Sequence, residues 1–313
     1  MKKTSSIYVA GHTGLVGSSI IKALKRKGYS NIITYSHEEC DLTIPWLADT
    51  VFRQRIPEYV FLAAAKVGGI HANMLYPGEF IRDNLQIQTN VMEAARKFGT
   101  TKLLFLGSSC IYPKFAEQPM KEESLLSGPL ESSNIGYALA KIAGNEMCKA
   151  YRKQWGCNYI SAMPSNLYGE NDNFSLMNSH CLPAMIRKFH EAKLSNITEV
   201  TLWGSGNSKR EFLHSEDLAE ALIFLMETYN GEDHINVGTG EDVTIKELAG
   251  IIKKIVGYEG EIYWDDSVPD GTPRKLLNVS KLNNLGWKSN IPLYEGAERT
   301  YEWFKDNYNT LRR

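Results

Sequence analysis

The sequence predicts an α/β fold in which a Rossmann-type, doubly wound parallel sheet is joined to a smaller, discontinuous C-terminal domain. Short apolar runs alternate with segments of helical periodicity through the first half of the chain, as they do in βαβ units. Three glycines, Gly11, Gly14 and Gly17, lie between the first apolar run and the first helical segment. Beyond Gly169 the chain is richer in Asn and Ser and less regular, which indicates a second unit.

The elements of the first half follow in order. The first helix is expected over residues 15–27, because Val16, Ile20 and Leu24 are four apart and Gly28 ends the pattern. Strands are expected at residues 7–10, 31–36, 59–65, 102–109 and 158–163. Longer helices are expected at residues 80–98 and 135–155.

Composition favours a soluble globular enzyme over several other classes. With 43% hydrophobic and 23% charged residues the chain is ordinary, and its net charge of -1 gives no surface for nucleic acid. No apolar stretch reaches the roughly 18 residues of a membrane span. The five cysteines, an odd number without a C-x-x-C pair, favour free thiols in the cytoplasm over disulfides or a metal site.

The glycine triplet predicts a dinucleotide site. A loop without Cβ atoms lets the backbone approach a diphosphate, and the helix that follows offers free N–H groups. The second expected strand ends in Tyr35-Ser36-His37, without an acidic residue for a ribose hydroxyl and without an arginine for a phosphate. This weakly favours NADP and leaves NAD open. Lys66 and His37 are possible phosphate partners, although each is more simply an ordinary surface residue.

The domain boundaries are predicted from the place where the chain is expected to return to the first unit. Residues 210–214 and 217–228 resemble a strand and a helix that rejoin the first unit. We therefore expect a dinucleotide-binding domain of residues 1–169 plus about 211–240, and a substrate domain of about 170–210 plus 241–313. The crevice between two such domains is the default ligand site.

Tyr137 and Lys141 are the most informative pair in the chain. Residues four apart on a helix share a face, and an ammonium beside a phenol is expected to lower the pKa of the phenol from its free value near 10. Ser108 and Cys110 follow an expected strand and are two apart, so they project to the same side. A tuned phenol beside a dinucleotide site indicates carbonyl–alcohol redox chemistry. For Cys110, a small buried hydrophobic residue is the simpler interpretation from spacing alone.

Seven segments carry a resemblance that spans nearly the whole chain. They are residues 63–70, 106–114, 137–144, 163–169, 178–180, 203–206 and 269–275. With these motifs in this order, the chain resembles the extended short-chain dehydrogenase/reductases that act on nucleotide sugars, and among them the GDP-L-fucose synthases. The Ser-Ser-Cys of residues 108–110 and the Asn-Ser-His of residues 178–180 are the most specific.

The resemblance implies a reaction and roles for five residues. The reaction is NADPH-dependent reduction of GDP-4-keto-6-deoxy-D-mannose at C4, with epimerisation at C3 and C5, to GDP-L-fucose. Ser108, Tyr137 and Lys141 would form the reductase triad. Cys110 and His180 would be the base and the acid of the epimerase steps, whereas His190 and His214 are expected to be structural.

The resemblance also implies binding residues and partners. The expected cofactor contacts are Gly11, Thr13, Gly14, Leu15, Val16, Gly17, Ala64, Lys141 and His180. The expected contacts to the GDP-sugar are Asn166, Lys188, Trp203, Arg210 and Lys275. A cofactor NADP(H) is implied, but Thr13 stands where the family carries an arginine, so NAD is not excluded. The family further implies a homodimer through helices of the first domain. For Trp203, core packing is the alternative.

Three other functions stay open at this stage. The nearest is a 4-ketoreductase without epimerase activity on a related GDP-4-keto sugar, such as a heptose. A dehydratase is less favoured, because Ser109-Cys110 stands where those enzymes carry an acidic pair. A dinucleotide-sensing protein without catalysis is disfavoured, because Ser108, Tyr137 and Lys141 are all present.

Overall fold

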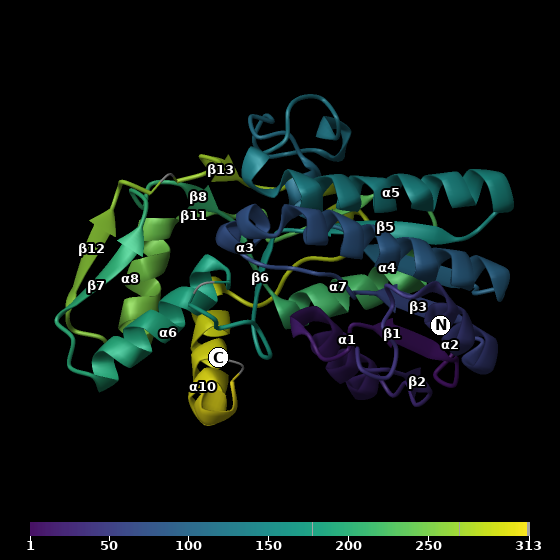
Figure 1. The fold of residues 1–313 in the computed structure, drawn as a ribbon, viewed down its shortest axis with the longest axis horizontal. Coiled ribbons are helices and arrows are strands. Elements are labelled where there is room, and N and C mark those ends of the chain that lie inside the picture. Colours follow the sequence, from purple (N-terminus) through teal and green to yellow (C-terminus); the bar gives the residue numbers. More distant parts are fainter. Residues whose placement is uncertain (177, 269, 312–313) are drawn as a thin grey trace.

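The protein is described by a computed structural model that covers residues 1–176, 178–268 and 270–311 (Figure 1). Residues 177 and 312–313 of the expected substrate domain, and Pro269 of the last family-like segment, lie outside the described residues. Six strands form a parallel sheet in the order β10-β5-β4-β3-β1-β2. Their bounds are β1 (Ile7–Ala10), β2 (Ile32–Ile33), β3 (Tyr59–Leu62), β4 (Lys102–Leu106), β5 (Tyr159–Pro164) and β10 (Ile235–Val237). The predicted doubly wound sheet is confirmed.

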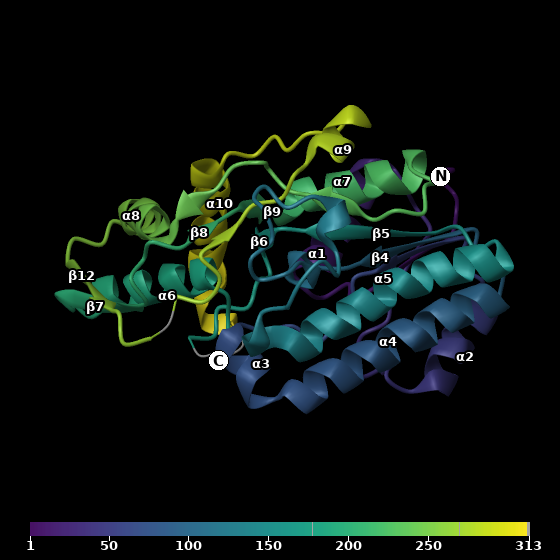
Figure 2. The same cartoon turned by 90° about the horizontal axis from the view of Figure 1, so that it is seen from above.

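Helices cover both faces of this sheet, and the alternation of side chains along each strand explains why. In β1, Ile7 and Val9 pack into the core beneath α1 (Leu15–Arg26) and α7 (Ser215–Thr228). Tyr8 and Ala10 point to the opposite face and pack into a second core. That face is covered by α2 (Pro45–Arg55), α4 (Pro77–Lys97) and α5 (Ile135–Trp155), and Figure 2 shows these helices on the side away from α7.

A smaller unit lies beyond the end of the sheet (Figure 1). It contains the helices α6 (Cys181–Leu194), α8 (Ile245–Val256) and α10 (Leu293–Asn307) around one apolar core. Its strands form two small sheets, β7 (Glu199–Trp203) with β12 (Glu261–Asp265), and β8 (Lys209–Arg210) with β11 (Val243–Thr244) and β13 (Arg274–Lys275). The smaller C-terminal unit predicted from the sequence is thereby confirmed in its fold.

The chain crosses between the two units through a pair of parallel strands, β6 (Asn166–Tyr168) and β9 (Phe212–His214). From β9 it continues into α7 and β10 of the large sheet. Later in the chain, the helix α9 (Ser280–Asn284) returns, because Leu282 and Trp287 pack in the core under α7. The exact domain boundaries stay a prediction.

Several expected strands are shorter in the structure, and polar residues at their ends account for it. The strand expected at residues 102–109 ends at Leu106, because Ser108 instead caps a 3-10 turn, η1 (Ser109–Ile111), by accepting from the Cys110 N–H at 3.2 Å. The strand expected at residues 31–36 is limited to Ile32–Ile33. The helix at residues 135–155 is confirmed at both ends, and Gly156 ends it with a φ of +68°.

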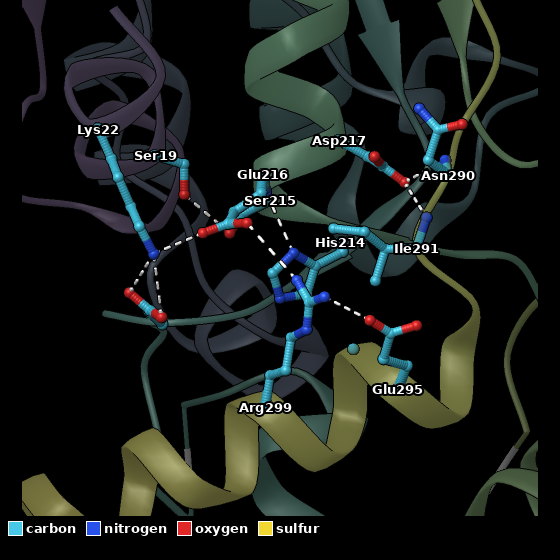
Figure 3. A network of polar contacts seen from close by, with 12 residues as sticks. Ser19, Lys22, His214, Ser215, Glu216, Asp217, Asn290, Ile291, Glu295 and Arg299 are labelled. Atoms are coloured by element: carbon cyan, nitrogen blue, oxygen red, sulfur yellow. Dashed lines mark hydrogen bonds and ion pairs between the residues drawn. The ribbon is translucent and has the colours of Figure 1, made fainter. Parts of the chain in front are cut away.

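Polar side chains join the first helix of the sheet domain to α7 (Figure 3). The Ser19 Oγ donates to the Ser215 Oγ at 2.8 Å, where both residues are buried. The Lys22 ammonium lies 2.5 Å from the Glu216 carboxylate and 3.3 Å from Glu170. The helix that follows the glycine loop is thus tied to the start of α7.

The Glu216 carboxylate also contacts the smaller unit. Arg299 of α10 lies 3.8 Å from Glu216 and also pairs with Glu295 on its own helix (Figure 3). His214 is buried, and its Nδ1 accepts from the Glu216 N–H at 3.3 Å, which caps α7. His214 is therefore a structural residue, as the sequence predicts, and it stands where α1, α7 and α10 meet.

No helix in the described ranges has both the length and the apolar character that a membrane span requires. Within the same ranges, no group of histidine, cysteine and acidic residues is arranged to hold a metal ion.

We predict that His214 makes the protein sensitive to acid. Burial lowers the pKa of this imidazole from 6.5 to about 4, so the unfolded chain binds a proton that the folded protein does not between these pH values. Stability therefore falls as the pH drops from 6.5 toward 4, by roughly 3 kcal/mol for this one group. His214→Asn keeps a capping oxygen for α7 and should reduce the pH dependence of stability by this amount, as measured by urea unfolding at a series of pH values.

The control for this variant is His37→Asn, because the His37 side chain is 79% exposed. It should leave the pH dependence unchanged. An equal loss of stability with falling pH in the parent and in His214→Asn would contradict the prediction.

Candidate active site

The glycine loop has two closely packed glycines and one open glycine. Gly11 has a φ of +85°, and a Cβ there would lie 2.7 Å from the backbone nitrogen of Ala64, after β3. A Cβ on Gly17 would lie 2.0 Å from the Gly11 carbonyl oxygen. At Gly14, by contrast, the nearest atom to a Cβ would be 3.7 Å away. The loop is therefore packed tightly against neighbouring backbone at Gly11 and Gly17, and it has open space at Gly14.

The start of α1 is suited to an anion. Gly14 is the N-cap and brings no side-chain acceptor to the first N–H groups of the helix, which begins at Leu15 and Val16. Unpaired N–H groups and the positive end of the helix dipole favour a phosphate at this place. Thr13 and Gly14 are exposed at the surface of the loop. The residues present thus fit the diphosphate of a dinucleotide.

The two side chains considered for an additional phosphate both lie beside carboxylates. The Lys66 ammonium pairs with Glu79 and lies 3.2 Å from Asp83, both on α4. His37 is exposed and lies 3.8 Å from Asp41. Both behave as the ordinary surface residues that the sequence favoured.

Ser108, which follows β4, and Tyr137 on α5 come together. Their side chains share a hydrogen bond, which acts to lower the pKa of Tyr137. Burial acts in the opposite direction and is stronger, and the neighbouring Cys110 adds to it, so the pKa of Tyr137 is raised well above its ordinary value of 10.

Lys141 is close to Tyr137 but is held by the backbone. Its ammonium donates to the Leu106 carbonyl at 2.8 Å and lies 5.7 Å from the centre of the Tyr137 ring. Burial lowers the pKa of Lys141 from 10.5 to about 7. The prediction that Lys141 lowers the pKa of Tyr137 is therefore wrong for this structure, because desolvation controls both groups and reduces the positive charge available to act on the phenol.

The Cys110 sulfur is oriented by two polar donors. The Asn134 side-chain amide donates to it at 3.2 Å, and the Lys275 ammonium lies 3.9 Å away. Cys110 is only half-buried. Its surroundings are thus more polar than those of the small buried hydrophobic residue that its spacing alone favoured.

His180 occupies the N-cap position of α6, without a side-chain bond to that helix. The residue is exposed, but protein atoms around its ring and, to a smaller extent, the positive charge of Lys275 lower its pKa below 6.5. Lys275 therefore acts electrostatically on His180 and contacts Cys110. The structure brings together Ser108, Cys110, Tyr137, Lys141, His180 and Lys275.

Three of the remaining expected substrate contacts, Arg210, Lys188 and Trp203, lie in the smaller unit, and Asn166 lies in β6. Arg210 in β8 is the register partner of Lys275 in β13. The Lys188 ammonium donates to the Thr201 carbonyl at 3.0 Å and lies 5.2 Å from the centre of the Trp203 ring. Trp203 is 52% exposed, so core packing does not explain it. Asn166 uses its side-chain amide to donate to the Glu211 carbonyl at 2.8 Å.

The sequence interpretation missed Glu211, which follows Arg210 directly. Its side chain is 1% exposed and accepts from the backbone N–H groups of Thr239 at 2.6 Å, Gly240 at 2.7 Å and Leu277 at 2.9 Å. Burial raises the pKa of this carboxyl to about 7. One buried carboxylate thus fixes the strands that carry Arg210 and Lys275. The available signal was a glutamate placed directly before the apolar pair Phe212 and Leu213.

The fold and the grouped side chains define the class. A Rossmann-type sheet with this glycine loop, and with Ser108, Tyr137 and Lys141 at one edge, is the architecture of a nucleotide-dependent oxidoreductase or epimerase. The model of the NAD dependent epimerase/dehydratase family matches residues 7–238, and the chain belongs to this family. It is therefore an NAD(P)-dependent enzyme.

Sequence similarity to two relatives extends over nearly the whole chain. The chain is 58% identical to "Probable GDP-L-fucose synthase 1" of Oryza sativa subsp. japonica, over 97% of this chain and 93% of the relative. It is 48% identical to the GDP-L-fucose synthase of Escherichia coli (strain K12), over 98% of each.

Solved structures agree with the fold. A GDP-L-fucose synthetase from Naegleria fowleri bound to NADP superposes with a TM-score of 0.94 at 30% identity, over 100% of this chain and 96% of that one. A GDP-6-OMe-4-keto-L-xylo-heptose reductase from C. jejuni also gives a TM-score of 0.94 at 37% identity, over 98% of this chain and 99% of that one.

We predict that Gly14→Ala weakens dinucleotide binding without affecting the fold. The backbone at Gly14 has a φ of -84°, which alanine adopts readily, and there is room for the methyl group. The methyl group would stand where a diphosphate must approach, so affinity for NADPH or NADH should fall by about 10-fold or more. Calorimetric titration with each nucleotide, together with thermal unfolding of the free protein, measures both effects.

The matched control is Gly250→Ala on α8, where a Cβ meets no atom within 4 Å. It should leave nucleotide affinity at the parent value. Unchanged affinity in Gly14→Ala would contradict the placement of the diphosphate at this loop.

We predict that Glu211→Gln destabilises the protein by about 1–3 kcal/mol. The amide group of glutamine would present a donor where the carboxylate accepts a backbone N–H. Urea unfolding of the parent, of Glu211→Gln and of Glu241→Gln measures the effect, because Glu241 is exposed on the same turn. Equal stability of the Glu211 variant and the Glu241 variant would refute the joining role of Glu211.

Proposed function

We propose that this protein converts GDP-4-keto-6-deoxy-D-mannose into GDP-L-fucose, by epimerisation at C3 and C5 and reduction at C4. Relatives named GDP-L-fucose synthase, at 48% and 58% identity over nearly full length, support the substrate and the product. The observation that carries the proposal is the grouping of the Cys110 sulfur with Lys275 and with the hydrogen-bonded pair of Ser108 and Tyr137.

We propose NADP(H) as the cofactor, held by the glycine loop. Support comes from the open space at Gly14, from the free N–H groups that begin α1, and from two similar proteins solved with NADP, the synthetase from Naegleria fowleri and a GDP-mannoheptose C4 reductase from Campylobacter jejuni. The residues assigned to it are Gly11, Thr13, Gly14, Leu15, Val16, Gly17, Ala64, Lys141 and His180. When bound, the reduced nicotinamide supplies the hydride that C4 of the sugar gains.

In the epimerase steps, Cys110 and His180 move protons. The C4 ketone acidifies the C–H groups at C3 and C5, so a base at Cys110 removes one of these protons and leaves an enolate. His180 returns a proton from the other face. Because burial and, to a smaller extent, the charge of Lys275 lower the pKa of His180, the imidazolium gives up its proton more readily once it has formed.

In the reduction, Tyr137 gives a proton to the C4 oxygen. The raised pKa of Tyr137 keeps the phenol protonated at neutral pH, and the alkoxide that develops at C4 is the base that takes this proton. The phenol therefore holds its proton until the alkoxide develops. Ser108 donates to the same oxygen and so stabilises the enolate and the alkoxide in turn.

The GDP part of the substrate is assigned to the smaller unit. Arg210 and Lys275 are paired in register and suit the diphosphate, because fixed cations bind phosphate oxygens strongly. Trp203 is half exposed beside the Lys188 ammonium, which suits the flat face of a base. Asn166 supports β8 through the Glu211 carbonyl.

A second candidate function is reduction of a GDP-4-keto-heptose at C4 without epimerisation. It is favoured by the likeness to two heptose reductases from Campylobacter jejuni, with TM-scores of 0.94 and 0.90 at 37% and 39% identity.

We further propose a homodimer in the cytoplasm. Exposed apolar side chains on α5 and before α4, among them Leu139, Ile135 and Leu75, provide a surface for a second copy. The five free cysteines are typical of a reducing compartment.

We predict that Tyr137→Phe lowers the rate of NADPH oxidation with the keto sugar by about 100-fold or more, because the proton donor is lost. NADPH affinity should not change. The control is Tyr151→Phe on the same helix, which removes a hydroxyl that donates to Glu93. Stopped-flow absorbance of NADPH measures the rate, and a parent-like rate in Tyr137→Phe would disprove the proton-donor role.

We predict that Cys110→Ser selectively blocks proton exchange at C3 and C5. A serine hydroxyl is a far weaker acid than a thiol and does not act as the base at neutral pH. Deuterium uptake from D₂O into the keto sugar, followed by NMR, should fall by about 100-fold or more. Cys157→Ser serves as the control, and exchange at the parent rate in Cys110→Ser would rule Cys110 out as the base.

A further inference from the structure

The side chain at the N-cap of helix α5 does not cap that helix. Asn134 ends the 3-10 turn η3 (Ser132–Asn134) and is the N-cap of α5, yet it makes no side-chain bond to the helix. Asparagine is favoured at this position because its oxygen accepts from the second or third N–H of the helix, here Gly136 or Tyr137. The Asn134 Oδ1 is buried and accepts from no donor in the described part of the chain. The Asn134 side chain therefore has a role other than capping.

The Asn134 amide instead contacts the proposed base of the epimerase steps. Its nitrogen donates to the Cys110 sulfur at 3.2 Å, and the Lys275 ammonium lies 3.9 Å from the same sulfur. A hydrogen bond to a charged acceptor is stronger than one to a neutral acceptor. The amide therefore stabilises the thiolate form of Cys110 more than the thiol form, and it also restricts the direction in which the sulfur points.

Glu131 holds the segments of both donors together. The Asn134 N–H donates to the Glu131 carbonyl at 3.4 Å. The Glu131 side chain is buried, lies 3.0 Å from the Lys114 ammonium and accepts from the Thr272 hydroxyl at 3.3 Å. Thr272 is three residues before Lys275 in the chain. One buried glutamate thus joins the segment that carries the Asn134 amide to the segment that carries the Lys275 ammonium.

We propose that Asn134 is a positioning residue for the epimerase steps, in which its amide orients the Cys110 sulfur and stabilises the thiolate instead of capping α5. The inference rests on the proposed function, in which Cys110 is the base. Only the thiolate removes the proton at C3 or C5. In this step a C–H bond breaks, an S–H bond forms and the electron pair stays on the sugar as the enolate. Asn134 acts on the step through the Cys110 sulfur that it contacts.

Stability and activity should respond differently to a change at Asn134. Aspartate and serine cap helices as well as asparagine does, and a negative charge also suits the positive end of α5. A carboxylate has no hydrogen to donate to the sulfur, and a serine side chain ends one bond earlier. Asn134→Asp and Asn134→Ser should therefore keep or raise the stability of the fold, while the Cys110 thiolate loses its amide donor.

Other charged groups near the Cys110 sulfur stay in place in these variants. Lys275 of β13, Arg210 of β8 and Tyr137 of α5 interact electrostatically with the sulfur. A change in the reactivity of the thiol is then due to the loss of the Asn134 amide.

The test uses the full chain in four forms, the parent, Asn134→Asp, Asn134→Ser and Asn31→Asp. Asn31 is exposed and precedes β2, so its variant is a matched control away from the site. Alkylation of Cys110 by iodoacetamide, followed by mass spectrometry at a series of pH values, measures the thiolate without any substrate. Deuterium uptake from D₂O at C3 and C5 of GDP-4-keto-6-deoxy-D-mannose measures the epimerase steps, and thermal unfolding measures stability.

We expect both Asn134 variants to unfold at the parent temperature or above it. Alkylation of Cys110 and deuterium uptake at neutral pH should each be slower by about 10-fold or more. The rise of the alkylation rate with pH should move upward by about one pH unit. Asn31→Asp should match the parent in all three measurements.

Three results would overturn the inference. Deuterium uptake at the parent rate in both Asn134 variants would overturn it and leave the proposed function intact. Unfolding of both variants at a lower temperature, with uptake lost in proportion to the unfolded protein, would reduce Asn134 to a structural role. No deuterium uptake by the parent would overturn the proposed function and the inference with it.

Discussion

The parallel alignment of the six-stranded sheet is the constraint on which the candidate site depends. β1 and β4 both pair with β3 in parallel register, so the segments that follow them emerge at one edge of the sheet. Gly11 follows β1, and Ser108 follows β4. An antiparallel β4 would carry Ser108 and Cys110 to the opposite edge. The register of buried strands thus brings together a nucleotide loop and a polar pair that are far apart in sequence.

The smaller unit depends on a different kind of interaction, a buried charge shared by several backbone groups. The Glu211 carboxylate accepts N–H groups from two distant segments and so fixes the strands of Arg210 and Lys275. Lys275 in turn reaches the Cys110 sulfur of the larger unit. Removing a group that satisfies several buried donors costs more than one hydrogen bond is worth, which explains why a costly buried carboxylate is kept beside the proposed diphosphate site.

Local sequence signals predicted much of the fold and part of the site. The glycine loop and the ends of α5 follow from residues in the segments themselves, such as Gly14 and Gly156, and they were predicted correctly. The pKa of Tyr137 was not predicted correctly. It depends on desolvation by Phe80 and other residues that the fold packs around the Tyr137 ring. Glu211 was missed for the same reason, since its partners lie 28 and 66 residues away in the chain.

The central claim is that one site carries out both proton exchange and hydride transfer. The most direct test is NMR of the product formed from GDP-4-keto-6-deoxy-D-mannose and NADPH in D₂O. We expect GDP-L-fucose with deuterium at C3 and C5 and with one NADPH oxidised per product. A C4-reduced sugar without deuterium, or no oxidation of NADPH, would contradict the claim.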